Sequence, residues 1–462
     1  MNPCSSSFQG AEAYTTKAVT FKFRGKFFSF ALSQGLFSSA AIDKGTGFLL
    51  KVLSQQWDAV TRQGKPLPQT VLDAGCGVGV IGICVAGALL VQGDSPWFPP
   101  SFHVRCQDRD ELATIITEYN AQKNRIPRGL LSSHTEPLLG GPLHARWDLI
   151  VSNIPAKAGK PVLADFILRS AALLNPGGSV LVVVVNPLAD FFRLQIAQAN
   201  LLLQYDELGR EHRVFMYGPL GSAPHPYGAI PYPGEVPLEP VQGGGGLFRD
   251  YPMYHRRRGN YVMEGLAYSL DTIQGVADFD TPSEAVQVAA KLMTRLKGET
   301  LRVSPRSSIL IYEPGQGHFP RWLLGYLAKE TKPEGASSMY RWVLFSRNIL
   351  ALEASRYNMA EETVLTIPGL DLSIHRKRLA AALEPERPTY DLIIGFPQFV
   401  PQTDRIIPLW EGIRELLSPG GIGIMALPAS EAERFDRKKP SGFNRLRDCK
   451  RNGFRAVGYR LL

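Results

Sequence analysis

Short apolar runs rich in β-branched residues alternate along the chain with stretches of helical periodicity. In the first half the runs are TVLDA (70–74), HVRCQD (103–108), DLIVSN (148–153) and SVLVVVV (179–185), and ELATIITEYNAQK (111–123) is one of the helical stretches. Such alternation is typical of βαβ units, in which helices cover both faces of a parallel sheet. We therefore predict an α/β fold with doubly wound, mostly parallel sheets.

The same pattern occurs a second time in the C-terminal half. VRCQDRDELATIITEYN (104–120) aligns without gaps with WVLFSRNILALEASRYN (342–358), DLIVSNIP (148–155) with DLIIGFP (391–397), and LLNPGG (173–178) with LLSPGG (416–421). DAGCGVG (73–79) is paired with EPGQGHF (313–319), which sets Glu313 opposite Asp73. Matches in the same order indicate a duplicated domain rather than a short-period solenoid.

A proline-rich segment separates the two copies. Residues 218–252 show neither helical nor strand periodicity and contain a run of four glycines. This composition favours a linker, with an ordered loop over a site as the alternative. The predicted organisation is a first domain at 1–217, a linker at 218–252 and a second domain at 253–462.

The cysteines and the apolar runs of the sequence indicate the cellular compartment. The five cysteines form no CxxC pair, which favours a reducing compartment and argues against a zinc site. No apolar run approaches the roughly 20 residues of a membrane span. The N-terminal residues also lack the apolar core of a signal peptide. We expect a cytoplasmic protein without a metal and without a membrane contact.

Most of the net charge of +9 lies near the C-terminus. The segment from Arg434 to Arg460 contains ten Lys or Arg residues and only two acidic residues, Asp436 and Asp448. Four aromatic residues are interleaved with them: Phe435, Phe443, Phe454 and Tyr459. A basic tail of this kind is suited to phosphates, with aromatic rings for stacking on bases. A solvated helix face is the alternative.

A glycine-rich turn joins a predicted strand to a predicted helix in TVLDAGCGVGVIGICVAGAL (70–89). In a doubly wound sheet this turn lies at the carboxyl ends of the strands, where glycine lets the backbone approach a ligand. Asp108 ends the next strand, where a carboxylate binds two ribose hydroxyls and repels a 2′-phosphate. Asp73 is suited to a cationic amino group. The combination favours S-adenosylmethionine, with a nicotinamide-binding domain and a purely structural turn as alternatives.

Asn153 ends the predicted strand DLIVSN (148–153), on the same edge of the sheet as the glycine-rich turn. Methyl transfer from a sulfonium requires the lone pair of the accepting nitrogen to point at the methyl group. A carboxamide oxygen accepts an N–H bond of an exocyclic amine without adding a full charge, and Pro155 stiffens the turn that carries it. The alternative is an asparagine that only satisfies its own turn.

Three segments carry a family resemblance: QGLFSSAAIDKGTGFLL (34–50), DAGCGVGVIGI (73–83) and SNIPAKAGK (152–160). They resemble the methyltransferase small-domain family of class I S-adenosylmethionine-dependent methyltransferases, and the chain is similar to the ribosomal RNA guanine-N2 methyltransferases of that family. The resemblance implies two tandem Rossmann-like domains, with Asn153 and Pro155 orienting the target amine. The expected cofactor-binding residues are Asp73, Ala74, Gly75, Cys76, Gly77, Gly79, Asp108, Arg109, His134 and Asn153. His134, in LLSSHTEPLL (130–139), falls where a loop of the predicted sheet touches adenine, although an ordinary loop residue is the alternative.

The sequence departs from the family pattern beside Asn153. Ile154 stands where the family has its first proline, and Ala156 where it has an aromatic or large aliphatic residue that would stack on a flipped-out base. Lys157 and Lys160 are candidate substrate residues that hold phosphate, or are simply solvated.

The second copy lacks the chemistry of the first. Ser346 stands at the ribose carboxylate position, and Gly395 or Phe396 replaces the asparagine. We expect a non-catalytic copy that binds or orients substrate, with a retained cofactor site at EPGQG as the alternative.

The leading hypothesis is an S-adenosylmethionine-dependent N-methyltransferase that acts on an exocyclic amine of a base in RNA, with N2 of guanine in rRNA favoured. The second domain and the basic tail would hold the RNA. One alternative is N-methylation of a protein amide or a small-molecule amine. Another is a non-catalytic S-adenosylmethionine-binding scaffold.

Overall fold

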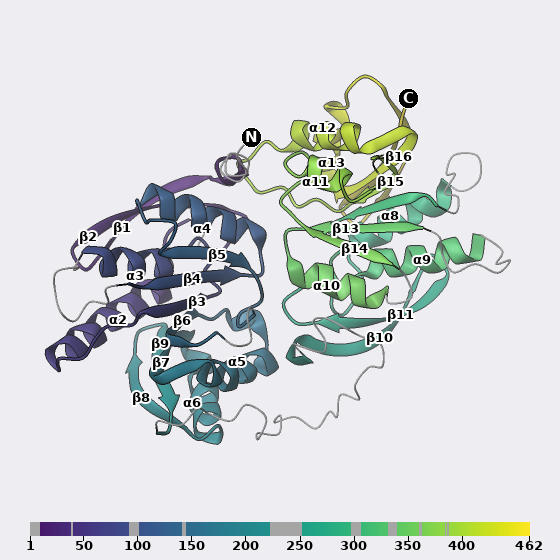
Figure 1. Ribbon diagram of the computed structural model, residues 1–462. Coiled ribbons are helices and arrows are strands. Elements are labelled where there is room, and N and C mark those ends of the chain that lie inside the picture. Colours follow the sequence, from purple (N-terminus) through teal and green to yellow (C-terminus); the bar gives the residue numbers. More distant parts are fainter. Residues whose placement is uncertain are drawn as a thin grey trace. The chain divides into compact units, whose positions relative to one another are not determined.

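The computed structural model describes residues 10–37, 40–91, 101–140, 145–221, 252–296, 306–330, 340–359, 363–383, 385 and 388–462. The chain divides into two compact units, the first built mainly from residues up to Pro237 and the second mainly from those after it. In Figure 1 the first unit is coloured purple to teal and the second teal-green to yellow. The predicted linker, 218–252, lies almost entirely outside the described residues, although Gly218 and Pro219 end a strand of the first unit.

The first unit is built on a seven-stranded sheet in the order β5-β4-β3-β6-β7-β9-β8. Neighbouring strands from β5 to β7 are parallel, and β9 is antiparallel to both β7 and β8. The strands are β3 (Thr70–Ala74), β4 (His103–Asp108), β5 (Leu131–Thr135), β6 (Trp147–Asn153), β7 (Leu174–Val185), β8 (Leu201–Leu208) and β9 (His212–Pro219). The four predicted apolar runs are therefore confirmed as strands. The chain continues from β3 to β4 on one side and later to β6 on the other, which makes the β3–β6 boundary the switch point where such sheets bind ligands.

Helices connect these strands and cover the sheet (Figure 1). They are α2 (Lys44–Arg62), α3 (Val80–Val91), α4 (Glu111–Lys123), α5 (Lys160–Ala172) and α6 (Ala189–Gln198), with the short 3-10 turns η1 (Ala156–Ala158) and η2 (Asn186–Leu188). A separate hairpin, β1 (Lys17–Phe23) and β2 (Lys26–Leu32), precedes the sheet. Helix α3 packs between sheet and hairpin, since a Cβ at Gly82 would lie 2.3 Å from Cys106 Sγ and one at Gly87 would lie 2.4 Å from Phe28 Cε1.

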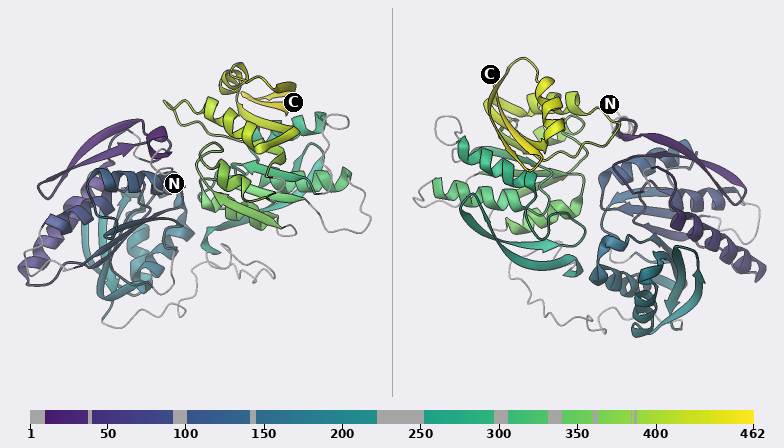
Figure 2. Two further views of the ribbon diagram at one scale, coloured as in Figure 1. Left: turned by 45° about the horizontal axis from the view of Figure 1, so that its top comes forward. Right: turned by 180° about the vertical axis from the view of Figure 1, so that it is seen from behind.

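The second unit repeats this architecture (Figure 2). Its sheet has the order β14-β13-β12-β15-β16-β18-β17, which is the order of the first sheet strand for strand. The strands are β12 (Ser308–Tyr312), β13 (Arg341–Ser346), β14 (Val364–Pro368), β15 (Tyr390–Gly395), β16 (Leu417–Pro428), β17 (Phe443–Arg451) and β18 (Phe454–Leu461). The helices are α8 (Glu284–Arg295), α9 (His318–Glu330), α10 (Ile349–Asn358), α11 (Arg376–Ala380), α12 (Ile406–Leu416) and α13 (Ala429–Arg437), and the hairpin is β10 (His255–Met263) and β11 (Leu266–Ile273), preceded by η3 (Pro252–Tyr254). The predicted tandem α/β duplication is confirmed.

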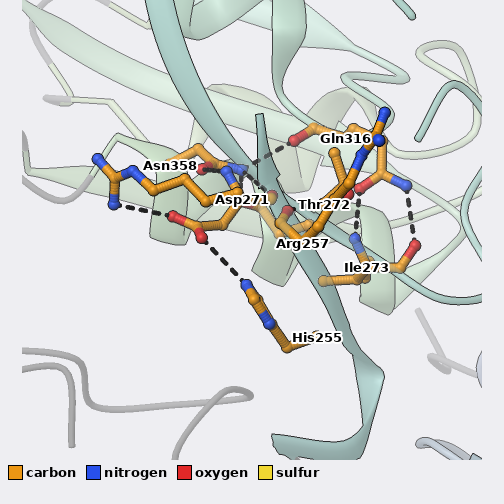
Figure 3. Close-up of polar contacts among 9 residues, drawn as sticks. His255, Arg257, Asp271, Thr272, Ile273, Gln316 and Asn358 are labelled. Atoms are coloured by element: carbon orange, nitrogen blue, oxygen red, sulfur yellow. Dashed lines mark hydrogen bonds and ion pairs between the residues drawn. The ribbon is translucent and has the colours of Figure 1, made fainter. Parts of the chain in front are cut away.

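An asparagine fixes the hairpin of each unit to its helical layer. In the second unit Asn358 Oδ1 accepts from Asp271 N (2.9 Å), while Asn358 Nδ2 donates to Asp271 O (2.8 Å), as Figure 3 shows. In the first unit Asn120 makes the same pair of bonds to Ala31, at 2.7 and 3.1 Å. Because each asparagine bonds both the N–H and the carbonyl of one residue in the second hairpin strand, Asn120 and Asn358 occupy equivalent positions in the two units.

This equivalence corrects the predicted pairing of the glycine-rich turns. Thr117 Oγ1 donates to Gly77 O and Ser355 Oγ donates to Gly315 O, each at 3.1 Å, so Gly315 is the counterpart of Gly77. Glu313 therefore stands opposite Gly75 and not opposite Asp73. The pairing from the sequence was wrong by two residues because the spacing before the turn differs between the copies.

The basic C-terminal segment is not a tail. It forms α13, the edge strand β17 and the inner strand β18. Phe435, Phe443 and Tyr459 are buried around Trp410, and only Phe454 among the interleaved aromatics is partly exposed. The expectation that these rings are available to stack on bases is therefore wrong for three of the four. No helix among the described residues combines the length and apolarity that a membrane span requires.

Candidate functional site

The turn between β3 and α3 is held by three left-handed glycines, with φ of 77° at Gly75, 56° at Gly77 and 83° at Gly79. The Gly75 and Cys76 N–H groups donate to the carbonyl of Gln107 at the end of β4. A Cβ at Gly79 would lie 2.8 Å from a side-chain carbon of α4, whereas no described atom lies within 4 Å of the Cβ position at Gly77. Gly79 thus allows helix packing, and Gly77 leaves open space at the edge of the sheet.

The end of β6 lies directly beside this turn. Strands β3 and β6 are parallel neighbours, with Asp73 opposite Val151. The Ser152 hydroxyl donates to the Ala74 carbonyl at 2.6 Å and fixes the two strand ends to each other. The glycine-rich turn and Asn153 therefore share one edge of the sheet, as the sequence predicted.

The Asn153 carboxamide has a defined orientation. Its Nδ2 donates to Asp43 Oδ2 and to Thr46 Oγ1, each at 2.9 Å. Since a carboxylate only accepts hydrogen bonds, the amide nitrogen and not the amide oxygen must face Asp43. Asn153 is partly exposed, and its Oδ1 accepts no hydrogen bond from the described residues. This leaves an acceptor at the edge of the sheet for an N–H group.

Two carboxylates lie under and beside the turn. Asp73 is fully buried, with Oδ2 accepting from Gly82 N at 2.8 Å and Oδ1 without a hydrogen-bond partner among the described residues. Asp108 accepts from Gly77 N (3.1 Å) and Asp110 N (3.0 Å). Burial raises the pKa of both carboxyls, that of Asp73 to about 7, where the charge of Asp108 adds to the effect and the Gly82 N–H opposes it. An unpartnered oxygen and two carboxylates with raised pKa fit a ligand that brings positive charge and hydroxyl donors.

The burial of Asp73 gives stability a pH dependence. Its native pKa of about 7 lies above the ordinary 3.8, so between these values the folded state holds a proton that the unfolded state has lost. The free energy of unfolding then falls as the pH rises, by up to about 1.4 kcal/mol per pH unit. Asp73→Asn removes this term, and we expect the variant to gain about 2 kcal/mol relative to wild type from pH 5 to pH 7. Denaturant unfolding without ligand at both pH values measures the difference, and a difference that stays constant would contradict the assignment.

The other predicted site residues are distributed around this edge. His134 Nε2 lies 3.0 Å from Ser132 Oγ, and burial followed by the charge of Arg105 lowers the pKa of the ring. No hydrogen bond in the described part of the chain joins His134 to the glycine-rich turn or to Asn153. Arg109 follows Asp108 and is partly exposed. Both remain predicted cofactor contacts.

The structure gives a reason for Ile154, one of the two departures from the family pattern beside Asn153. Ile154 is only 4% exposed and packs in the core of the first unit, so this position serves folding and not the site. Pro155, Ala156 and Lys157 are exposed, with Ala156 and Lys157 in η1. Lys160, at the start of α5, is exposed and lies over the Phe191 ring at 5.7 Å. Both lysines remain candidate substrate contacts.

Sequence reasoning missed three residues that shape the site: Asp43, Thr46 and Ser152. The first two lie in the segment IDKGT (42–46), which entered the family resemblance without a role for any of its residues. In the described residues, no group of three or more His, Cys, Asp or Glu side chains is arranged to hold a metal ion.

Residues 28–199 match the family model of the methyltransferase small domain. The chain is 26% identical over 182 residues to ribosomal RNA small subunit methyltransferase C of Pasteurella multocida, covering 38% of this chain and 44% of that protein. It is 32% identical over 156 residues to the protein of the same name from Chromohalobacter salexigens, covering 33% and 40%. The chain thus matches less than half the length of these curated relatives.

Among solved structures, the chain resembles a T. thermophilus 16S rRNA N2 G1207 methyltransferase in complex with AdoMet and guanosine. The TM-score is 0.57 at 16% identity, and the alignment covers 98% of this chain and 100% of that one. At this identity the likeness establishes the tandem fold across both units.

Proposed function

We propose that the methyltransferase small domain at residues 28–199 transfers a methyl group from S-adenosylmethionine to an exocyclic amine of a base in RNA, with N2 of guanine in rRNA favoured. The observation that carries this proposal is the Asn153 carboxamide. Its nitrogen is bonded within the protein and its oxygen accepts from no donor in the described part of the chain, at the same edge of the sheet as the open space over Gly77.

Different residues of the first unit are suited to the cofactor and to the target amine. S-adenosylmethionine supplies an electrophilic methyl group. Asp108 and the open turn at Gly77 are suited to its ribose, and Asp73 to its cationic end. Asn153 Oδ1 accepts an N–H bond of the target amine, which turns the nitrogen lone pair away from the ring system and eases later loss of the proton. Positioning is therefore the main contribution of the protein.

RNA as the substrate is supported by the relatives and by the charge of the second unit. The edge strand β8 of the first unit carries Asp206 and Glu207, whereas its counterpart β17 carries four basic residues: Arg445, Arg447, Lys450 and Arg451. Arg445 pairs with Asp448 at 2.9 Å and Arg451 with Glu284 at 2.6 Å. Arg447 and Lys450 are exposed and make no ion pair with a described residue, so they are the cations left for phosphate.

Neutralising these two cations tests the RNA contact. We expect Arg447→Gln combined with Lys450→Gln to weaken binding of an rRNA fragment about 10-fold and to lower the slope of log affinity against log salt by about 2, since each phosphate contact releases about one counterion. Binding titrations at several salt concentrations measure both values. Lys65→Gln combined with Lys377→Gln, which removes two exposed lysines outside β17, is the matched control. Equal slopes for all three proteins would exclude β17 as the RNA-binding surface.

The second unit is proposed to bind no cofactor. Glu313 takes the place of Gly75, and its carboxylate accepts from Ser346 Oγ at 2.7 Å, so the turn of the second unit carries a side chain where the first unit has glycine. Ile311, an apolar residue, stands at the place of Asp73. We expect calorimetry to give one S-adenosylmethionine per chain, unchanged in Glu313→Ala. Two sites per chain would refute this assignment.

The activity itself is tested by labelled methyl transfer to rRNA with the purified protein, followed by mass spectrometry of the nucleosides. Methylated guanosine or adenosine identifies the base. Transfer that resists ribonuclease would favour a protein amide or a small amine as substrate. Binding of S-adenosylmethionine without a product in any cellular extract would favour a scaffold.

A further inference from the structure

We infer that Asp43 and Thr46 are positioning residues that lock the Asn153 carboxamide in the orientation needed to receive the target amine. This inference rests on the proposed function, because it gives these residues a purpose in methyl transfer. It assigns a role to IDKGT (42–46), a segment 110 to 107 residues away in sequence from the asparagine that it contacts.

The contacts saturate one end of the carboxamide. Asp43 precedes α2 as its N-cap, and its Oδ2 accepts both from Thr46 N (3.1 Å) and from Asn153 Nδ2 (2.9 Å). Thr46 Oγ1, on a residue only 7% exposed, accepts the second Nδ2 bond at 2.9 Å. The two hydrogens of the amide nitrogen thus have two acceptors. Rotation of the amide by half a turn would set its oxygen against the carboxylate of Asp43, a contact in which neither oxygen can donate.

Gly45, which lies between Asp43 and Thr46 in the chain, is constrained by the atoms around it. A Cβ at Gly45 would lie 2.8 Å from Asp43 Oδ2 and 2.9 Å from His212 Cδ2. Each of the three residues therefore has a structural reason. The Asp43 carboxylate and the Thr46 hydroxyl accept hydrogen bonds from the Asn153 amide, and glycine at position 45 leaves room for His212 of β9.

The two hydrogen bonds from Asn153 Nδ2 to Asp43 and Thr46, which we call the lock, have an electrostatic consequence. A carboxylate bonded to the amide nitrogen polarises the amide and increases the electron density on Oδ1, as successive hydrogen bonds strengthen each other. Oδ1 then accepts more strongly from an amine that gains positive charge as the methyl group is transferred. Asp43 supports this charge through Asn153 and without touching the substrate.

Three variants separate this role from helix capping. Asp43→Ser keeps a good N-cap for α2 but is too short to reach Asn153. Thr46→Val removes the hydroxyl and keeps the branched shape, and Thr46→Ser keeps the hydroxyl. We expect Asp43→Ser and Thr46→Val to lower kcat for RNA methylation about 10- to 100-fold, with little change in KM or in S-adenosylmethionine affinity, and Thr46→Ser to restore most of the rate. Equal losses in Thr46→Val and Thr46→Ser would contradict the role of the hydroxyl.

A double-mutant cycle provides the decisive comparison. In an Asn153→Ala background the carboxamide is absent, so Asp43→Ser and Thr46→Val should cause no further loss of kcat. If the two residues only stabilise α2, their effects should instead multiply with that of Asn153→Ala, and the inference would be overturned.

A spectroscopic measurement keeps the inference testable if the proposed activity fails. The side-chain amide signals of Asn153 in the nitrogen-15 spectrum of the full chain are identified by their loss in Asn153→Ala. We expect slow hydrogen exchange for these signals in wild type and fast exchange in Asp43→Ser. Fast exchange in wild type would refute the lock whether or not RNA is methylated. Slow exchange without RNA methylation would uphold the lock and reject only the proposed substrate.

Discussion

Asn153→Ala is expected to lower the rate of methyl transfer to RNA about 100- to 1,000-fold, because it removes the side-chain acceptor that the site presents to the target amine. The loss should appear in kcat. The alanine leaves the backbone of β6 in place, and Ser152 still fixes that strand to the turn through Ala74. Single-turnover transfer of labelled methyl groups measures the chemical step directly.

A second asparagine in the same unit provides the control. Asn175, near the start of β7, donates to Asp148 Oδ1 at 2.7 Å at the opposite end of the strands. Asn175→Ala removes a comparable hydrogen bond and should leave the rate of transfer within a few-fold of wild type. An Asn153→Ala protein as active as the Asn175→Ala protein would refute the proposed mechanism.

Gly77→Ala is expected to weaken S-adenosylmethionine binding about 10- to 100-fold, since the added methyl group points into the open space at the edge of the sheet where the ligand must pack. The left-handed φ of 56° also costs the unliganded protein about 1–2 kcal/mol. Isothermal calorimetry gives the affinity, and denaturant unfolding gives the stability.

Two other glycines separate these effects. Gly25, in the β1–β2 turn, has φ of 79° with no described atom within 4 Å of its Cβ position, so Gly25→Ala reports the backbone strain alone and should bind ligand normally. Gly79→Ala adds a clash with α4 and should destabilise the fold more than either. If Gly77→Ala binds S-adenosylmethionine as tightly as Gly25→Ala does, the ligand does not lie over this turn.

The local elements were accessible from the sequence because they depend on short-range periodicity. The run at 70–74 and the helical stretch at 111–123 have the same bounds in the structure as in the prediction. The strand at 148–153 extends by one residue to Trp147. Asn153 was placed correctly beside the glycine-rich turn because parallel strands in a βαβ arrangement end at the same edge.

The pairing of distant segments was less accessible. The C-terminal segment reads as a basic tail with free aromatic rings, yet Phe435, Phe443 and Tyr459 are core residues of the second sheet. In β17 the basic side chains are exposed, and in β18 Arg455 and Arg460 flank a run of four buried residues, so the high density of charge hides the two strands. Glu313 was likewise paired with the wrong residue, because the bonds that fix the register of the two turns, from Thr117 to Gly77 and from Ser355 to Gly315, join residues 40 positions apart.

The sequence by itself determined that the chain holds two α/β copies, and that the first carries a glycine-rich turn and an asparagine at the ends of its strands. These features are written in residues that are close together in the chain. Only the tertiary structure decided which way the Asn153 amide faces, because Asp43 and Thr46 lie more than 100 residues away and reach it only when α2 packs beside β6. The orientation of a side chain is set by the donors and acceptors around it in space, and the order of residues along the chain does not specify them.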